Sequence, residues 1–260
     1  MKRYFKFLLV IPLALLLMGG SCEDEPTEAL DGPDVYTLEA DINGIDLKID
    51  WDSSTDEVDG YRIYFNGDTA PLYEGTASEY THVNPSLGSY EIVAYFESDE
   101  SDPLEFNTSN YVTSGTSAEI WRFDVSGQPS GYGWNLSTGN GEHYNFTAGN
   151  ADYIDIYYTN MGEDYHSIAS ASYYGGSFEN VTWINKTSTS FDNLDTAPAT
   201  PTGYYNYEDV EINGTYALCI EKTGSDSYFG KMQVTAFDTD NNKVTFRWKF
   251  QKVKGWRVFE

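Results

Sequence analysis

The amino-acid sequence predicts an all-β protein with two antiparallel β-sandwich domains in tandem. Three observations predict this class. Apolar residues recur at every second position in many short segments, Gly, Asn and Asp separate those segments as turn residues, and no segment carries the period of a convincing helix. Aromatic residues make up 16% of the 260 residues, which supplies enough apolar area for packed cores.

The first 21 residues have the three parts of a secretory signal peptide. Basic residues at 2–6 precede an apolar run at 7–18, and small residues follow. The apolar run is too short to cross a membrane, because a spanning helix needs about 20 such residues. We therefore predict a signal peptide over residues 1–21.

Cys22 follows this segment directly. Gly20 and Ser21 before it resemble the lipobox of bacterial lipoproteins, although Gly19 stands where leucine is usual. The resemblance implies a lipid on Cys22 that holds the mature chain at the outer membrane of the cell envelope, facing outward. The alternative is an ordinary signal peptide with an incidental cysteine. The acidic segment 22–34 is predicted to be a flexible tether.

Alternating residues mark a first domain, predicted over residues 35–106. Its clearest strand places Ile49 and Trp51 on one face, and Lys48 and Asp50 on the other. Further short strands follow, with turn signals between them, as is typical of an antiparallel sandwich.

Three local motifs characterise this first domain. They are a tryptophan in LKIDW (Trp51), a tyrosine in GYRIYF (Tyr61) and the corner LGSY (Leu87 and Tyr90). In this order they resemble the fibronectin type III family. The resemblance implies a seven-stranded immunoglobulin-like sandwich that acts as a spacer or binding module. We expect the Tyr90 hydroxyl to satisfy a backbone group at the corner while its ring fills the core.

A polar segment rich in Ser and Thr, 107–118, predicts a linker, and residues 119–260 form a second β-sandwich or β-rich domain. A hairpin around DTDNN is its clearest feature, because Met232 and Val234 are answered by alternating apolar residues after the turn. The candidate strands of this domain are IWRFDV, ADYIDIYYTN, SFENVTWIN, TYALCIEKT, KMQVTAF and KVTFRWKF.

Arg247 and Lys249 alternate with aromatic residues on the last of these strands. We expect them to line its outer face, pair with acidic neighbours and protect a sheet edge.

Several segments of the second domain, among them GYGWNLSTG, NADYIDIYY and GTYALCIEKTGSDSYFGKMQVTAF, resemble a β-rich domain of bacterial surface lipoproteins. Some proteins of this general build capture haem. The resemblance therefore implies an alternative in which His143 and His166 ligate haem iron from two converging loops.

The charge balance restricts the partners. The chain has a net charge of −26, and removal of the first 21 residues takes away three positive charges and no negative one, which leaves −29. Such a surface repels phosphate backbones, so we predict no nucleic-acid partner; the membrane is contacted through the lipid. Cys22 and Cys219 are the two cysteines of the sequence. With Cys22 lipidated, no disulfide forms, and Cys219 is predicted to be an inert buried thiol.

Catalytic and metal-binding motifs give little support for an enzyme. HExxH and GxSxG do not occur in the sequence, and no cofactor is predicted. A glycan hydrolase stays an alternative only because carboxylates are abundant. Asp238 and Asp240 in DTDNN resemble the start of a calcium loop, but the later glycine and glutamate are missing, so we interpret the segment as a turn.

Tyrosines beside glycine and proline are the strongest ligand-binding candidates. Rings in such loops stack on the apolar faces of sugars or act as rigid contacts for proteins. The alternative is that they only cover strand ends. The sequence thus predicts a non-catalytic binding or scaffolding protein whose partner is a surface glycan or another surface protein. The candidates are Tyr173, Tyr174, Tyr204, Tyr205 and Tyr207.

Overall fold

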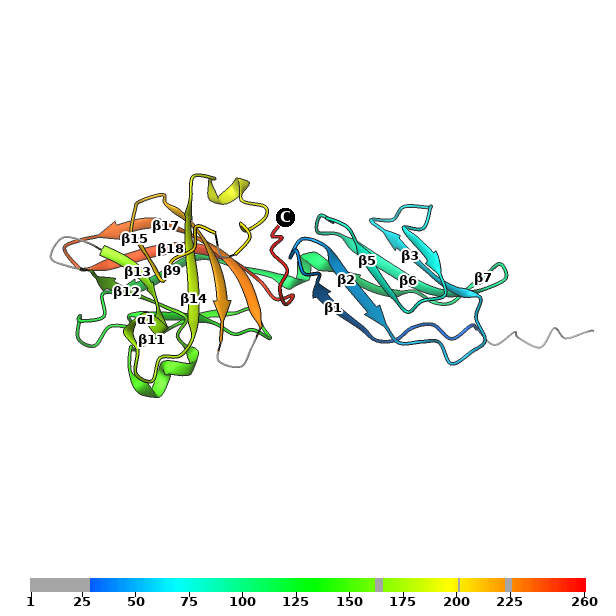
Figure 1. Ribbon diagram of the computed structural model, residues 1–260, viewed down its shortest axis with the longest axis horizontal. Coiled ribbons are helices and arrows are strands. Elements are labelled where there is room, and N and C mark those ends of the chain that lie inside the picture. Colours follow the sequence, from blue (N-terminus) through cyan, green and yellow to red (C-terminus); the bar gives the residue numbers. More distant parts are fainter. Residues whose placement is uncertain (1–28, 162–165, 201, 223–225) are drawn as a thin grey trace, which may run out of the picture.

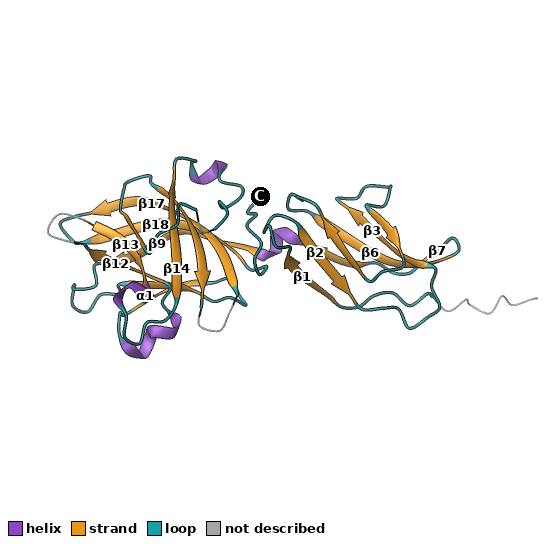
Figure 2. Cartoon of the chain, viewed as in Figure 1, coloured by secondary structure: helices purple, strands orange, loops and turns teal. Residues whose placement is uncertain are grey.

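The computed structural model describes residues 29–161, 166–200, 202–222 and 226–260. Two β-rich domains follow one another along the long axis, and the C-terminus lies between them (Figure 1). Strands dominate both domains (Figure 2). Within the described residues, no helix combines the length and hydropathy needed to cross a membrane. The predicted signal peptide and Cys22 lie outside these residues.

The first domain is an immunoglobulin-like β-sandwich, as predicted. Every strand pair in it is antiparallel. One sheet has the order β1 (Tyr36–Ala40), β2 (Leu47–Trp51), β5 (Glu79–His82). The other has the order β4 (Tyr73–Gly75), β3 (Gly60–Phe65), β6 (Ser89–Phe96), after which β7 (Asp99–Glu100) and β8 (Leu104–Asn107) both pair with β6.

The predicted apolar face of this domain is buried. Ile49 is fully buried, and Trp51 is nearly so. Tyr90 at the LGSY corner is also fully buried, but its hydroxyl lies 2.8 Å from Nδ1 of His82. The expectation of a backbone partner was wrong, because His82 at the end of β5 reaches the hydroxyl across the core.

The second domain consists of two five-stranded antiparallel sheets that face each other. The long sheet has the order β14 (Val181–Thr187), β16 (Thr215–Glu221), β17 (Ser227–Asp238), β18 (Lys243–Gln251), β9 (Val112–Trp121). The short sheet has the order β11 (Gly141–Tyr144), β10 (Gly131–Trp134), β12 (Ile156–Asn160), β13 (His166–Ser170), β15 (Tyr207–Asp209). Short helices connect the strands: η1 (Thr108–Tyr111), η2 (Ala148–Tyr153), α1 (Ala171–Tyr174) and η3 (Phe191–Asn193).

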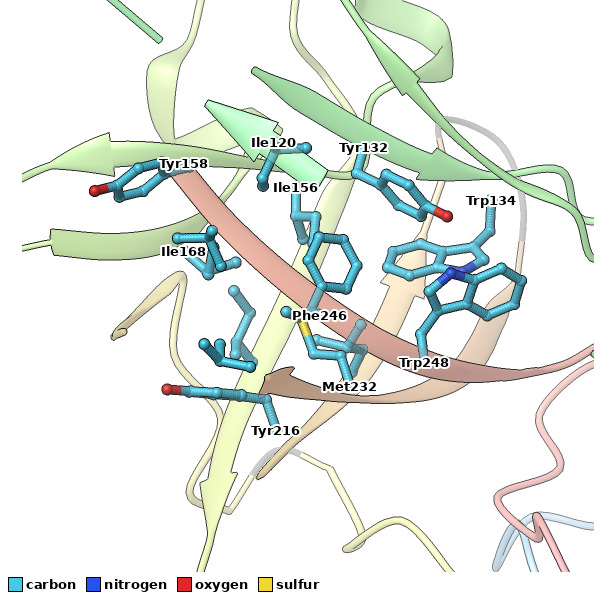
Figure 3. Close-up of a cluster of buried hydrophobic side chains, with 14 of the residues drawn as sticks. Ile120, Tyr132, Trp134, Ile156, Tyr158, Ile168, Tyr216, Met232, Phe246 and Trp248 are labelled. Atoms are coloured by element: carbon cyan, nitrogen blue, oxygen red, sulfur yellow. The ribbon is translucent and has the colours of Figure 1, made fainter. Parts of the chain in front are cut away.

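Aromatic and aliphatic side chains together fill the space between these two sheets (Figure 3). The ring of Tyr132 meets Phe246 edge-on at 5.0 Å, and Trp134 packs edge-on against Trp248 at 6.0 Å. The predicted hairpin around DTDNN is present, with Met232 paired to Trp248. Such edge-to-face pairs add stability beyond the burial of their area.

The segment predicted as a linker belongs to the folded structure. Residues 108–111 form η1, and β9 begins at Val112 and pairs with β18 along its length. Ser and Thr are strand residues here, because β9 is a terminal strand of its sheet and Ser114, Thr116 and Ser117 are exposed.

The C-terminal segment crosses the predicted domain boundary. Val253, Trp256 and Val258 complete the core of the first domain. Trp256 is fully buried, and its indole N–H donates to the carbonyl of Ile45 at 3.2 Å. The second domain therefore ends near Gln251 as a structural unit, and the last residues join the two domains. We call residues 252–260 the C-terminal tail.

The described part of the predicted tether, residues 29–34, packs on the first domain. Leu30 contacts the core, and the Asp31 carboxylate accepts a hydrogen bond from the Thr55 hydroxyl at 2.6 Å. Any flexible tether therefore ends before these residues.

For β16 and β18, the structure confirms the predicted burial and ion pairs but not the predicted protection of a sheet edge. Cys219 is fully buried, as expected, and burial raises the pKa of its thiol to about 12. Arg247 pairs with Asp192 at 2.9 Å and Lys249 pairs with Glu260. The edge-protecting role was wrong, because β18 lies between β17 and β9.

Candidate functional site

The outer face of the short sheet carries a cluster of aromatic rings. Tyr157 on β12 and Tyr207 on β15 both pair with Ala169 on β13, so the three residues share one row and one face. Their neighbours Tyr158 and Ile168 point into the core instead. The period of two thus places Tyr157 and Tyr207 on the outside of the domain.

Helix α1 adds two more tyrosines to this face. The ring of Tyr173 lies 5.3 Å from that of Tyr207, and the ring of Tyr174 lies 6.2 Å from that of Tyr157, both edge-on. Phe123, which follows β9, contacts Tyr157 and Tyr174 at 6.2 Å each. We call these five residues, Phe123, Tyr157, Tyr173, Tyr174 and Tyr207, the aromatic platform.

Buried rings hold the platform in place. Phe146 stacks on Tyr157 at 4.5 Å and on Phe178 at 4.2 Å, so the exposed rings rest on a packed layer. Tyr157 itself is 3% exposed, and burial raises the pKa of its phenol to about 12. The Tyr157 phenol is therefore uncharged at neutral pH, and packing fixes the position of its ring.

Four of the five rings of the platform, all except Tyr157, are open to solvent. Phe123, Tyr173, Tyr174 and Tyr207 are between 40% and 56% exposed. Rigid aromatic rings lose little conformational entropy on binding, and their faces match the apolar faces of sugar rings. Three of the five tyrosine candidates thus converge on one surface.

The other two tyrosine candidates lie elsewhere. Tyr204 is buried against the outer face of the long sheet, and its hydroxyl donates to the carbonyl of Pro198 at 3.0 Å. Tyr205 forms a backbone bridge with Ile184 that joins β14 to the short sheet, while its ring is 59% exposed.

The two histidines weighed for haem do not meet. His143 on β11 and His166 on β13 are separated by β10 and β12, and their register differs by four residues. With strand spacings of about 4.8 Å and a rise of about 3.3 Å per residue, their backbones lie roughly 20 Å apart. In addition, Nδ1 of His166 lies 2.5 Å from the Tyr158 hydroxyl. The structure therefore does not bring this pair together around one iron.

The DTDNN segment forms the turn of the β17–β18 hairpin. The Asp238 carboxylate accepts hydrogen bonds from the backbone and side-chain N–H groups of Asn241 at 3.0 and 2.7 Å. Across the described ranges, no three His, Cys, Asp or Glu side chains gather as a metal site would require, and Asp240 belongs to no such group.

The structure also contains a groove that the sequence analysis did not predict. A groove of about 820 Å³ lies between β9 and β11. Residues 115–119 of β9 and 141–143 of β11 form its walls, and Trp121, Tyr132 and Trp248 also line it. We call it the slit. His143, considered above only as a haem ligand, lies on its wall.

Comparisons with known proteins add little to this description. No family model and no curated protein matches the chain. Among solved structures, the crystal structure of FN3tt aligns with 30% of this chain and 92% of that chain, at 17% sequence identity and a TM-score of 0.25. The strand order by itself shows a tandem of antiparallel β-sandwiches whose first member has an immunoglobulin-like build.

Proposed function

We propose that this protein is a bacterial envelope lipoprotein that binds a glycan on the aromatic platform, without catalysis. One observation carries the proposal: four exposed rings from three separate segments lie on the outer face of the short sheet. Phe123 and Tyr174 contact the buried ring of Tyr157, and Tyr173 and Tyr207 contact each other. Exposed apolar clusters mark interaction sites more often than chance, because water-exposed rings otherwise favour aggregation.

The chemistry of the platform favours a sugar. Three of its four open rings belong to tyrosines, which offer an apolar face for stacking and a hydroxyl for hydrogen bonds with sugar hydroxyls. The chain without residues 1–21 carries a net charge of −29, so glycans rich in sulfate or carboxylate are repelled. The proposed ligand is therefore a neutral glycan.

The anchoring part of the proposal rests on the sequence. The apolar run, the small residues and Cys22 support lipidation, and an acidic segment follows directly. Cys22→Ser should move the protein from the detergent phase to the aqueous phase in a detergent partition of whole cells. A wild-type protein already in the aqueous phase would rule out the lipid anchor.

Binding is tested with neutral polysaccharides in affinity electrophoresis and on a glycan array. Phe123→Ala and Tyr174→Ala each remove one stacking ring, which should weaken binding about 5- to 30-fold, or about 1–2 kcal/mol. Phe96→Ala is the matched control, because Phe96 is as exposed as Phe123 but lies on the first domain. Equal losses in Phe96→Ala and Phe123→Ala, or no binding by the wild type, would contradict the proposal.

A further inference from the structure

The two facing sheets of the second domain together form an incompletely closed barrel, because they are joined at one margin and separated at the other. At one margin, Ile184 and Tyr205 exchange two backbone hydrogen bonds at 2.8 Å and join the long sheet to the short one. At the other margin, β9 and β11 are the terminal strands of their sheets, and the slit separates them. The slit is thus the opening that the barrel leaves between two strand edges.

Hydrogen bonds close the slit at both ends. The Thr113 hydroxyl donates to the carbonyl of Gly139 at 2.6 Å at one end. At the other end, the backbone N–H of Trp121 donates to the carbonyl of Pro129 at 2.9 Å. A peptide strand running through the slit would have to cross both contacts, whereas the end of a chain fits between them.

Both walls present backbone donors and acceptors. The N–H of Trp121 points away from β18, so by alternation the peptide groups of Glu119 also face the slit. On β11, Asn140 accepts a bond from Asn135 of the neighbouring strand, and alternation then turns the peptide groups of Gly141 and His143 outward. The walls therefore offer N–H and C=O groups in alternation, which suits neighbouring hydroxyls of a sugar.

Glycines keep the floor of the slit accessible. A Cβ at Gly115 would lie 2.5 Å from Nε1 of Trp248, and a Cβ at Gly141 would lie 2.5 Å from the Tyr132 hydroxyl. Without these side chains, the polar atoms of both rings border the slit. Both rings are about 95% buried, so the floor is rigid.

The rim adds carboxylates whose positions are fixed. Glu119 accepts from the Lys243 ammonium at 2.9 Å, and Glu142 accepts from the Tyr144 hydroxyl at 3.2 Å. Each carboxylate keeps further acceptor positions for ligand hydroxyls. Among the described residues that line the slit there is no lysine or arginine, and the ammonium of Lys243 at its rim is already paired with Glu119.

We infer that the slit between β9 and β11 is a second carbohydrate site, which takes the end of a neutral glycan. This inference rests on the proposed function and assigns a different part of the glycan to each of the two sites. The open platform stacks on rings anywhere along a chain, while the closed slit admits a terminal ring that has hydroxyls free on several sides.

The test uses methyl glycosides of glucose, galactose, mannose, xylose and N-acetylglucosamine, each too small to need the platform. The readout is the set of indole N–H signals in ¹⁵N-correlated NMR spectra, assigned with Trp121→Phe and Trp248→Phe. At least one glycoside should shift the signals of Trp121 and Trp248 with a millimolar Kd. Glu142→Gln and His143→Ala should weaken this binding about tenfold or more, which corresponds to about 1.4 kcal/mol.

Two control variants separate the sites. The double variant Tyr174→Ala/Tyr207→Ala removes platform rings and should leave the glycoside shifts unchanged. Glu105→Gln alters an exposed glutamate of the first domain and should also leave them unchanged. Both slit residues under test are exposed, so their variants should fold, and an unshifted indole signal of Trp183 on β14 of the second domain will confirm this.

The outcomes are distinct. If polysaccharides bind through the platform but no glycoside shifts the slit signals, the inference is wrong and the proposed function stands. Shifts that persist in Glu142→Gln and His143→Ala would also overturn the inference. If only the extended hexapeptide Lys-Val-Thr-Val-Thr-Lys shifts these signals, the slit is a strand-binding site and the inference is wrong. If neither polysaccharide nor glycoside binds, both proposals fail.

Discussion

The two domains share a class of fold but differ in what their surfaces carry. On the first domain, the outer faces bear ion pairs, such as Lys48 with Asp50 and Glu79. Its exposed large apolar residues, among them Phe96, are scattered over separate elements. On the second domain, the exposed rings touch one another and rest on buried ones. The clustering of exposed rings on the second domain, and not their exposure alone, is the surface difference on which the proposed glycan binding rests.

The C-terminal tail joins the second domain to the core of the first. Loss of its buried tryptophan should therefore give the largest change in the free energy of unfolding. Trp256→Ala empties a fully buried position in the core of the first domain and removes the bond to Ile45. The expected loss is about 3–5 kcal/mol of unfolding free energy. Chemical denaturation measures it, followed through the indole N–H signal of Trp51 in ¹⁵N-correlated NMR spectra, because Trp51 belongs to the core of the first domain. Equal stability of the variant and the wild type would show that the first domain does not need the tail.

A comparison of two adjacent tyrosines should give a smaller effect. Tyr204→Ala removes a buried ring and its hydrogen bond to Pro198, which should cost about 3 kcal/mol. Tyr205→Ala removes an exposed ring and should change stability by less than about 0.5 kcal/mol. Thermal unfolding of both variants measures whether the loss of stability follows the burial of each tyrosine side chain. Similar losses in both would contradict this division.

The pH dependence of stability should differ between the domains in a third, weaker effect. Burial lowers the pKa of His82 in the first domain and of His166 in the second. A pKa that is lower in the folded state means that folding favours the neutral ring. The contribution of each histidine to the free energy of unfolding is therefore present above about pH 6.5 and is lost as the pH falls below it.

Asp155 opposes this trend in the second domain alone. Its burial raises the pKa of the carboxyl to about 6, despite an ion pair with Lys222 at 3.1 Å. The contribution of Asp155 to the free energy of unfolding is therefore present below the unfolded pKa of about 3.9 and is lost as the pH rises through 6. On acidification from pH 6.5 to pH 4.5, the first domain should therefore lose more protection than the second in hydrogen exchange. Asp155→Asn should bring the two losses closer together; a second domain that already loses more in the wild type would refute the argument.

The sequence was most informative where one side-chain period continues through an element. The hairpin of β17 and β18 was predicted because Met232 and Val234 alternate with outward residues on both sides of a turn. Strands β10 and β11 were missed, since Gly131, Gly133 and Gly141 interrupt that period. Those glycines are required by close neighbours: a Cβ at Gly133 would lie 1.7 Å from the carbonyl oxygen of Tyr153.

The candidate sites were predictable only in part, for a related reason. Tyr173, Tyr174 and Tyr207 were recognised because glycine and proline around them indicated exposed loops. Phe123 was not, because it continues the alternation of IWRFDV and so suggested an ordinary strand residue. The slit depends on two strand edges, at 115–119 and 141–143, that only the sheet order brings together. No local pattern in the sequence encodes that order.

The place of Trp256 also constrains when the protein can finish folding. The first domain precedes the second along the chain, yet part of its core comes from residues that follow the second domain. During synthesis it must therefore wait as an incomplete sandwich with an open apolar end, until residues 253–258 have emerged from the ribosome. A chain cut before Val253 would keep that apolar end unfilled.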